Sequence, residues 1–256
     1  MDSDYVAVNR DVWDADAPNW VSVGEELWAL EVPRWGNWGH PDEGLALLPE
    51  DMRGLTAIEL GCGTAYVSGW MARRGAQVTA IDVSPAQLET ARSLAAKHGA
   101  DIAFIEGNAE ATGLPDAAFD FAISEYGAAI WCPPDVWLRE AWRLLRPGGR
   151  LVFLGNHPLS LICSPLDGAP CDQTLHRPYR DMWGADWTQV EIEPSGVCFN
   201  LTMGDWMALF SEIGFDVRKY DEVYAPDWAD GVRGSVPAEW AKIYPLEQVW
   251  HLTKRG

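Results

Sequence analysis

The chain has 256 residues and carries 19 Lys and Arg residues against 38 Asp and Glu residues, which gives a formal net charge of −19. This length suits one α/β domain with a large core and an added cap. The charge argues against a nucleic-acid partner, because a phosphate backbone would be repelled. We find no apolar stretch of about twenty residues and no signal-like start. The five cysteines lack C-x-x-C spacing. We therefore expect a cytoplasmic protein with reduced thiols and no membrane partner.

Residues 1–50 are rich in tryptophan and are interrupted by several prolines and glycines. Such interruptions shorten helices, because proline cannot donate a backbone hydrogen bond and clashes with the preceding turn. We expect an N-terminal cap over 1–50 and a main domain over 51–256. Short helices are predicted in this cap near 9–16, 22–31 and 42–48.

From residue 55 onward, short β-rich runs alternate with helical patterns, which is typical of a parallel sheet between helices. Ser84 and Pro85 are typical of a helix start, as N-cap and first-turn residue. We predict strands at 55–60, 77–82, 101–106, 119–124 and 150–155. The predicted helices lie at 64–74, 85–98 and 134–146.

The pattern becomes irregular after Asn156, where prolines and glycines recur for about thirty residues. A stretch of this kind in a compact fold is usually a lid or a binding loop, so we predict an inserted cap over 156–200. Within it, the runs 188–192 and 197–201 flank Glu193-Pro194-Ser195-Gly196 and are expected to form a hairpin. Beyond it, we predict a helix at 203–213 and strands at 215–220 and 247–253.

One glycine-containing loop carries most of the functional information. The strand Ala57–Leu60 runs into Gly61-Cys62-Gly63, and the next strand ends in Asp82. Glycines let the main chain approach a ligand, and an acid at the second strand end can accept hydrogen bonds from two ribose hydroxyls. A dinucleotide site would have a third glycine where this chain has Tyr66. The carboxylate of Glu59 would repel a diphosphate but suits an ammonium or sulfonium group.

The segment Glu59-Leu60-Gly61-Cys62-Gly63-Thr64 resembles motif I of class I S-adenosylmethionine-dependent methyltransferases, in the small-molecule branch typified by ubiquinone and menaquinone biosynthesis. The resemblance is close over about residues 55–155 and looser beyond. It continues through Ile81-Asp82-Val83-Ser84-Pro85, Gly107-Asn108-Ala109-Glu110, Leu114-Pro115, Phe119-Asp120 and Leu145-Arg146-Pro147-Gly148-Gly149-Arg150-Leu151. It implies a Rossmann-like three-layer α/β sandwich, with a mostly parallel sheet of about seven strands whose last strand is antiparallel.

The resemblance also implies a cofactor site for S-adenosyl-L-methionine, with S-adenosyl-L-homocysteine as product. Asp82 would bind the ribose, Val83 would pack on the adenine, and Glu59 would reach the ammonium group. Asn108 stands where the family commonly has Asp, so it would meet the adenine amino group as an amide, or else serve as a turn residue bonded locally. The implied cofactor-binding residues are Glu59, Gly61, Cys62, Gly63, Asp82, Val83, Gln87, Asn108, Ala109, Glu110 and Glu125.

The candidate catalytic residues are His157, Glu125 and Tyr126. Methyl transfer needs an acceptor aligned with the methyl group, and a hydroxyl or carbon acceptor also needs a base. His157 follows a predicted strand at the edge where ligands bind, although a structural role beside Pro158 fits it nearly as well. The substrate candidates are Trp35, Trp38, Trp131, His176 and Tyr179, as aromatic or polar groups of the caps.

Several alternatives remain open. Cys132-Pro133-Pro134-Asp135 looks like an amino-methyltransferase motif, but its position and composition favour a helix entry. Glu125, Asn156 and His157 carry metal-ligand atoms, yet we expect no metal. We expect a monomer or homodimer that methylates a small metabolite. The rivals are a non-methylating enzyme such as a cyclase or decarboxylase, a binding protein without turnover, and a nicotinamide oxidoreductase, which Tyr66 opposes.

Overall fold

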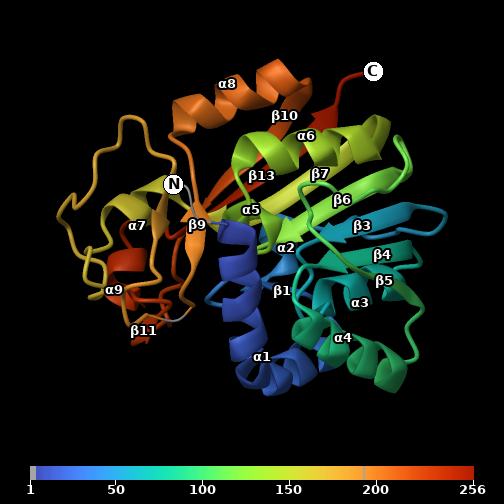
Figure 1. Cartoon of the computed structure of the whole chain (residues 1–256), viewed down its shortest axis with the longest axis horizontal. Coiled ribbons are helices and arrows are strands. Elements are labelled where there is room, and N and C mark those ends of the chain that lie inside the picture. The colour runs from blue at the N-terminus through green and yellow to red at the C-terminus, as the bar shows by residue number, and fades with distance from the viewer. Residues whose placement is uncertain (1–3, 193) are drawn as a thin grey trace.

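The computed structural model describes residues 4–192 and 194–256, and its centre is one twisted sheet (Figure 1). Seven strands lie in the order β10-β13-β7-β6-β3-β4-β5. The last strand in the chain, β13, is antiparallel to both neighbours, and the pairs among β3 to β7 are parallel. The strand bounds are β3 Thr56–Leu60, β4 Gln77–Asp82, β5 Ile102–Glu106, β6 Phe119–Glu125, β7 Leu145–Asn156, β10 Phe215–Val223 and β13 Glu247–Lys254. The predicted fold class is confirmed.

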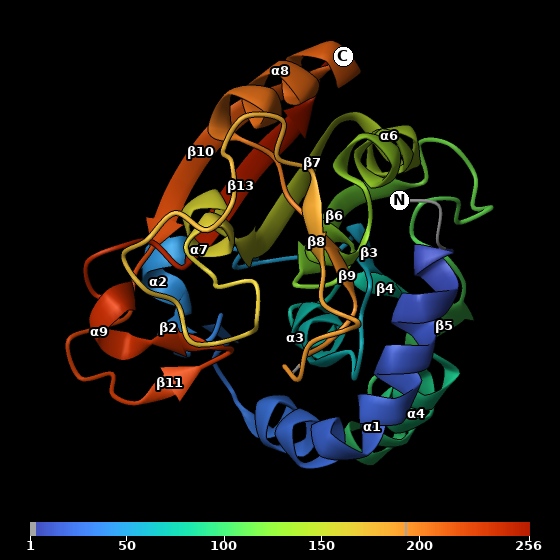
Figure 2. The same ribbon diagram turned by 60° about the vertical axis from the view of Figure 1, so that its left-hand side comes forward.

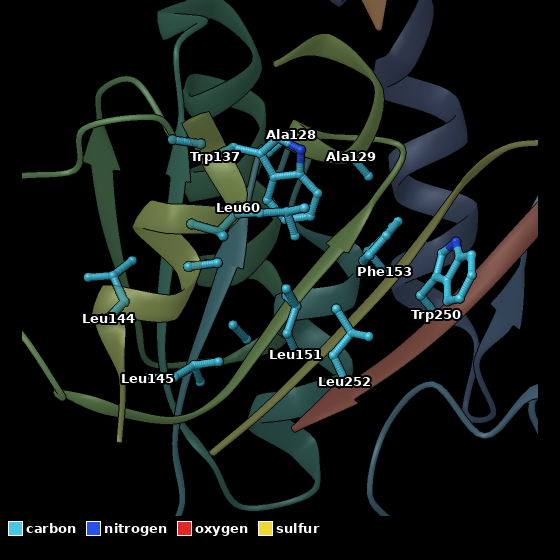
Figure 3. Close-up of a cluster of buried hydrophobic side chains, with 14 of the residues drawn as sticks. Leu60, Ala128, Ala129, Trp137, Leu144, Leu145, Leu151, Phe153, Trp250 and Leu252 are labelled. Atoms are coloured by element: carbon cyan, nitrogen blue, oxygen red, sulfur yellow. The ribbon is translucent and has the colours of Figure 1, made fainter. Parts of the chain in front are cut away.

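Helices cover both faces of this sheet, and neighbouring strand residues alternate between the two cores. Phe153 and Trp250 point to the face covered by α6 (Pro134–Leu144) and α8 (Met203–Ile213), where Figure 3 shows them packed among leucines. Val152 and Val249 point to the opposite face, which α3 (Tyr66–Arg73) covers. Helix α4 (Pro85–His98) lies on that second face beside Ala80. Burial on both faces explains why these strands read as continuous apolar runs.

The N-terminal segment differs from its prediction. The two helices expected at 9–16 and 22–31 form one helix, α1 (Tyr5–Ala29), which contains Pro18 and bends midway (Figure 2). A proline inside a helix removes one hydrogen bond and bends the chain without always ending the helix. Packing against α4 holds α1 together through the bend. The helix expected at 42–48 is the short α2 (Asp42–Leu45), beyond the strand pair β1 (Arg34–Trp35) and β2 (His40–Pro41).

The cap beyond β7 has little regular structure. Helix α7 (Pro158–Ile162) follows β7, and the pair β8 (Gly184–Asp186) and β9 (Val197–Phe199) closes the insertion. A later segment adds β11 (Val232–Arg233), β12 (Val236–Pro237) and α9 (Ala238–Ala241). The short helix α5 (Ala128–Trp131) connects β6 to α6. Within the described ranges, no helix combines the length and apolar character that crossing a membrane requires.

The predicted hairpin is half wrong. Its second strand overlaps β9, but the partner is β8, and 188–192 forms no strand. Asp186 ends β8 because its carboxylate accepts hydrogen bonds from the backbone and side chain of Thr188. The chain then turns, with the Val190 N–H donating to the Trp187 carbonyl. Such local side-chain bonds compete with strand pairing. Glu193, which belongs to the predicted turn, lies outside the described residues.

Candidate functional site

The glycine loop after β3 touches the start of α5 backbone to backbone. Gly61 has φ +76, and a Cβ there would lie 2.6 Å from the Ala128 nitrogen and 2.7 Å from the Gly127 Cα. A Cβ on Gly127 would in turn lie 2.1 Å from the Gly61 carbonyl oxygen. Only glycine at both positions allows this approach. The contact joins the ends of β3 and β6 into one floor at the carboxyl edge of the sheet, where open α/β sheets bind ligands.

Asp82 lies at the end of β4 and organises the same loop. Its two carboxylate oxygens accept hydrogen bonds from the Gly63 N–H at 2.7 Å and the Ser84 N–H at 2.9 Å. Burial raises its pKa, while these donors lower it. Each oxygen keeps a lone pair free because a carboxylate oxygen can accept two bonds. Asp82 can therefore bind further hydroxyl donors while it holds the loop.

A cavity of about 310 Å³ opens above this floor and extends beneath the caps. The structure brings every predicted cofactor residue together at its wall, although their contact with a cofactor stays a prediction. These residues are Glu59, Gly61, Cys62, Gly63, Asp82, Val83, Gln87, Asn108, Ala109, Glu110 and Glu125.

Three buried polar atoms in this wall lack partners, and they test whether a polar ligand fits. The Thr64 Oγ1, Gln87 Nε2 and Glu110 Oε1 atoms are buried without a hydrogen bond, and all three residues line the cavity. Unpaired buried polar atoms are costly, so such a group usually marks a binding function. Asn108 differs, because its side chain accepts the Glu110 N–H at 2.9 Å, the local turn bond foreseen as its alternative role. A ligand with several donors and acceptors, such as a nucleoside, fits this wall.

Acidic side chains dominate the floor. Glu59 accepts hydrogen bonds from the Ser68 N–H at 2.8 Å and from the Ser68 hydroxyl. Burial raises the pKa of Glu59 to about 8, with Glu125 and Asp82 nearby adding to the rise. In the part of the chain that the structure describes, no Lys, Arg or His forms an ion pair with Glu59 or Glu125. A ligand bearing an ammonium or sulfonium charge would supply the missing counter-charge.

Two tyrosine–carboxylate pairs flank the end of β6. Glu125 accepts from the Tyr66 hydroxyl and from the Gly36 N–H, so Tyr66 takes the position of a third motif glycine and binds the strand-end acid. Tyr126, at φ +56, donates its hydroxyl to Glu247 at the start of β13. The Glu247 Oε2 atom is buried without a partner. Burial raises the pKa of Glu247 to about 7. The second pair was not foreseen from the sequence, because Glu247 lies 121 residues from Tyr126.

His157 lies outside the cavity wall. Its Nδ1 atom accepts the Leu159 N–H at 3.0 Å and caps α7, and its Nε2 atom faces Glu222 at 3.5 Å. Burial lowers the pKa of His157 to about 4, against the opposing effect of Glu222. This geometry supports the capping role weighed for it. A role as general base stays a prediction without support from this arrangement.

Of the substrate candidates, only Trp131 lines the cavity. Trp35 is fully buried, with its indole N–H bonded to Asp42, and Trp38 belongs to the core between the cap segments. His176 pairs with Asp172 at 2.9 Å, and the Tyr179 hydroxyl accepts the Met203 N–H at the surface. These four residues lie outside the cavity wall, so their placement at the substrate stays a prediction without support from this geometry. Aromatic composition alone does not separate core positions from pocket positions.

Other residues reach the cavity without having been predicted. Helix α1 contributes Val6, Asn9, Trp13 and Trp20, and the insertion contributes Ser160, Leu161, Trp187 and Ile192. The third contribution, from 234–236, comes from a segment that was not assigned to the cap. One signal for Trp13 and Trp20 was available, because a seven-residue spacing places two side chains on one face of a continuous helix. Pro18 obscured it by dividing the predicted helix.

The ligand types noted at adjacent strand ends do not form a metal centre. Glu125 and Asn156 line the cavity, but the His157 ring nitrogens face Leu159 and Glu222. Across residues 4–192 and 194–256, no group of three or more His, Cys, Asp or Glu side chains is arranged to hold a metal ion. The five cysteines are free thiols in the structure.

A family model described as "Methyltransferase domain" matches residues 58–153, the span from β3 to β7 that holds the glycine loop and Asp82. Residues 58–153 of this chain form a methyltransferase domain. The domain's strands β3 to β7 form the parallel part of the sheet, and its glycine loop and Asp82 line the cavity.

The methyltransferase domain has curated relatives with different acceptors in their names. A rice (Oryza sativa subsp. japonica) "2-methyl-6-phytyl-1,4-hydroquinone methyltransferase 2, chloroplastic" is 35% identical over 77% of this chain and 50% of its own length. A "malonyl-[acyl-carrier protein] O-methyltransferase" of Serratia marcescens is 38% identical over 39% of this chain and 38% of its own length. The chain thus spans about half or less of the length of these relatives.

Solved structures share the fold over most of the chain. An S-adenosylmethionine-dependent methyltransferase from Mesorhizobium loti matches with a TM-score of 0.64 at 24% identity, over 82% of this chain and 94% of that one. The [4+2]-cyclase SpnF matches with the same TM-score of 0.64 at 20% identity, over 96% of this chain and 95% of that one. These similarities extend the domain's fold to the cap regions.

Proposed function

We propose that this protein binds S-adenosyl-L-methionine on the Gly61–Gly63 loop and transfers its methyl group to a small-molecule acceptor held beneath the caps. The observation that carries the proposal is the cavity wall, in which buried polar atoms of Thr64, Gln87 and Glu110 have no partner. A polar, nucleoside-sized ligand would satisfy them. The negative charge of the chain and the cavity's caps favour a metabolite over nucleic acid.

The residues take the following roles in this proposal. Asp82 accepts hydrogen bonds from the ribose hydroxyls while it holds the Gly63 N–H. Val83 packs on the adenine. Glu59, at the floor, compensates the positive charge of the methionine part. Glu125 and Tyr126, at the end of β6, lie beside the transfer position. Since burial without a cation raises the pKa of Glu59, a bound positive charge would favour its ionised form.

When bound, S-adenosyl-L-methionine would supply an electrophilic methyl group to the acceptor and would leave as S-adenosyl-L-homocysteine. The protein's contribution is to align the acceptor and exclude water. A hydroxyl acceptor also loses a proton. We assign the acceptance of this proton to Tyr126. Its phenolic oxygen would receive the proton from the acceptor, while the hydroxyl proton of Tyr126 passes to Glu247. The hydrogen bond from Tyr126 to Glu247 and the free Oε2 atom of Glu247 support this assignment over His157.

Titration calorimetry with S-adenosyl-L-homocysteine is the first test, and we expect a Kd well below millimolar. Incubation with S-adenosyl-L-methionine labelled in its methyl group and a metabolite extract follows, with mass spectrometry as readout. Transfer of the label to a metabolite, with release of S-adenosyl-L-homocysteine, is the expected result. Conversion of a metabolite without label would indicate a non-methylating enzyme. Binding without any turnover would indicate a binding protein, and no binding heat would end the cofactor assignment.

A further inference from the structure

One group of the residues that line the cavity has a distinct composition. We call it the acceptor compartment and define it by Trp131, Leu161, Trp187, Ile192, Val236 and Leu246. These residues come from α5, α7, the insertion, β12 and the loop before β13, so the insertion and the segment 231–246 meet here. Their side chains are aliphatic or indole groups. Such a surface recognises a ligand by apolar contact and ring packing.

The charged side chains that line the cavity all come from the carboxyl ends of β3, β4 and β6 or from the loop after β5. Among the described residues that line it, the acids are Glu59, Asp82, Glu110 and Glu125, and there is no Lys, Arg or His. The nearby Arg177 is already engaged outside the wall. It donates to the carbonyl of Leu161 at 3.1 Å, and its guanidinium lies 4.5 Å from the Trp187 ring centroid.

Two serine hydroxyls that line the cavity beside the compartment are turned toward the backbone. The Ser160 hydroxyl donates to the His157 carbonyl at 2.7 Å, and the Ser164 hydroxyl donates to the Ser160 carbonyl at 2.8 Å. The carbonyl of Asn156 accepts from the side chains of Asn200 and Gln248. These hydroxyls are therefore committed as donors. An anion entering the compartment would exchange its hydration for mostly apolar walls, with no cation on the described wall and without these two hydroxyls as donors.

We propose that the acceptor compartment selects an uncharged, predominantly apolar acceptor and rejects acceptors that carry a carboxylate or phosphate. This inference rests on the proposed function, since it concerns the same cavity. Three features combine: the absence of a cation from the described wall, the commitment of the serine hydroxyls, and the net charge of −19. All three raise the free energy of an anion in the compartment. None of them penalises a neutral ring system.

A pair of isosteric probes tests this selection. Naphthalene-2-carboxamide and naphthalene-2-carboxylate have the same shape and differ in charge at pH 7.5. Each is titrated by calorimetry into the full-length protein saturated with S-adenosyl-L-homocysteine. We expect a Kd for the amide at least tenfold lower than for the carboxylate. Equal or tighter binding of the carboxylate would overturn the proposal, and so would failure of both probes to bind at millimolar concentration.

A matched pair of variants locates the effect. Ile192→Lys adds one positive charge at the compartment wall, and Leu175→Lys adds the same charge at a side chain that is 66% exposed and outside the wall. We expect Ile192→Lys to strengthen carboxylate binding at least fivefold and Leu175→Lys to leave it unchanged. If both variants strengthened carboxylate binding equally, the overall charge and not the compartment would account for the selection, and the proposal would be refuted. If the unmodified protein did not bind S-adenosyl-L-homocysteine, that result would instead refute the proposed function.

Discussion

Asn9 binds the backbone of Val197 as a neighbouring strand would, although 188 residues separate them. Its amide nitrogen donates to the Val197 carbonyl at 2.9 Å, and its amide oxygen accepts the Val197 N–H at 2.8 Å. The same nitrogen donates to the Trp131 carbonyl at 3.2 Å. Asn9 is 3% exposed. One side chain thus fixes helix α1 to strand β9 and to the end of α5, across the cavity.

Asn9→Ala should release α1 from this position. The change leaves both Val197 backbone groups buried without partners, at a cost of about 1–3 kcal/mol. We expect a lower Tm, faster hydrogen exchange in α1 and weaker S-adenosyl-L-homocysteine binding. Asn19→Ala is the control, because the exposed Asn19 lies on the same helix and its side chain bonds to Asp16 of that helix. Unchanged exchange in α1 of the Asn9 variant would show that packing on α4 alone holds the helix.

Asp82→Ala should weaken S-adenosyl-L-homocysteine binding tenfold or more. A lost pair of buried hydrogen bonds costs about 1–3 kcal/mol, and 1.4 kcal/mol corresponds to a factor of ten. Calorimetry measures the change. Asp101→Ala, at an exposed position before β5, controls for the loss of one negative charge. Equal affinities of the two variants would remove Asp82 from the ribose site.

Glu247 should make the unliganded protein less stable as pH rises. Its pKa in the fold is about 7, above the ordinary value of 4.5, so the folded state binds its proton more tightly than the unfolded state. The resulting stability is present below pH 4.5 and is lost as pH rises through 7. Glu59, with a pKa of about 8, acts in the same direction.

Glu247→Gln should therefore flatten the fall in Tm between pH 5.5 and 8 relative to the unmodified protein. Thermal unfolding in both backgrounds measures the slope. Glu222→Gln is the matched control, because Glu222 lies on the neighbouring strand β10 and its side chain is 43% exposed. Parallel slopes for the unmodified and Glu247→Gln proteins would contradict the assignment of the proton to Glu247.

His157 should behave as a cap. His157→Ala removes the acceptor for the Leu159 N–H and should destabilise the fold by about 1 kcal/mol, as lost N-caps do. His157→Asn restores an acceptor in similar reach and should recover most of that Tm loss. Binding of S-adenosyl-L-homocysteine should match the unmodified protein in both variants. If the Asn variant regains stability but loses methyl transfer, the base assignment returns to His157.

Trp131→Ala should weaken binding of naphthalene-2-carboxamide about two- to tenfold, which corresponds to the ~0.5–1.5 kcal/mol of an aromatic contact. Trp131 lines the cavity and packs edge-to-face on Trp13 at 5.4 Å. Trp228→Ala, at a residue that is 66% exposed, controls for the loss of one indole. Calorimetry on the protein saturated with S-adenosyl-L-homocysteine provides both values. Equal effects would remove Trp131 from the compartment.

The sheet and the cofactor side could be predicted because their signals are local. Strands buried on both faces are continuous apolar runs, and the glycine loop and Asp82 occupy consecutive strand ends. A family resemblance then predicted seven strands with an antiparallel last strand, and residues that the structure places at the cavity wall. The same local rule failed at 188–192, where Asp186 ends a strand through its own side chain.

The acceptor side could not be predicted because its contacts join distant segments. Trp131 and Trp38 have the same residue type, and only the packing of the caps places one at the cavity and the other in a core. The partnership of Tyr126 with Glu247 depends on the antiparallel pairing of β13 beside β7. No sequence periodicity within either segment predicts that Tyr126 and Glu247 are neighbours. For the same reason, the segment 231–246 was not predicted to belong to the cap.

The mutual approach of Gly61 and Gly127 limits which sequences can keep this floor. A methyl group on either residue would collide with the main chain of the other. Because the other residue is already glycine, no smaller side chain there can relieve the collision. A substitution at one site therefore has no suppressor at the other. In a library randomised at both positions, selection for folded, ligand-binding protein would return the glycine pair alone, and the two sites would show no compensating exchanges.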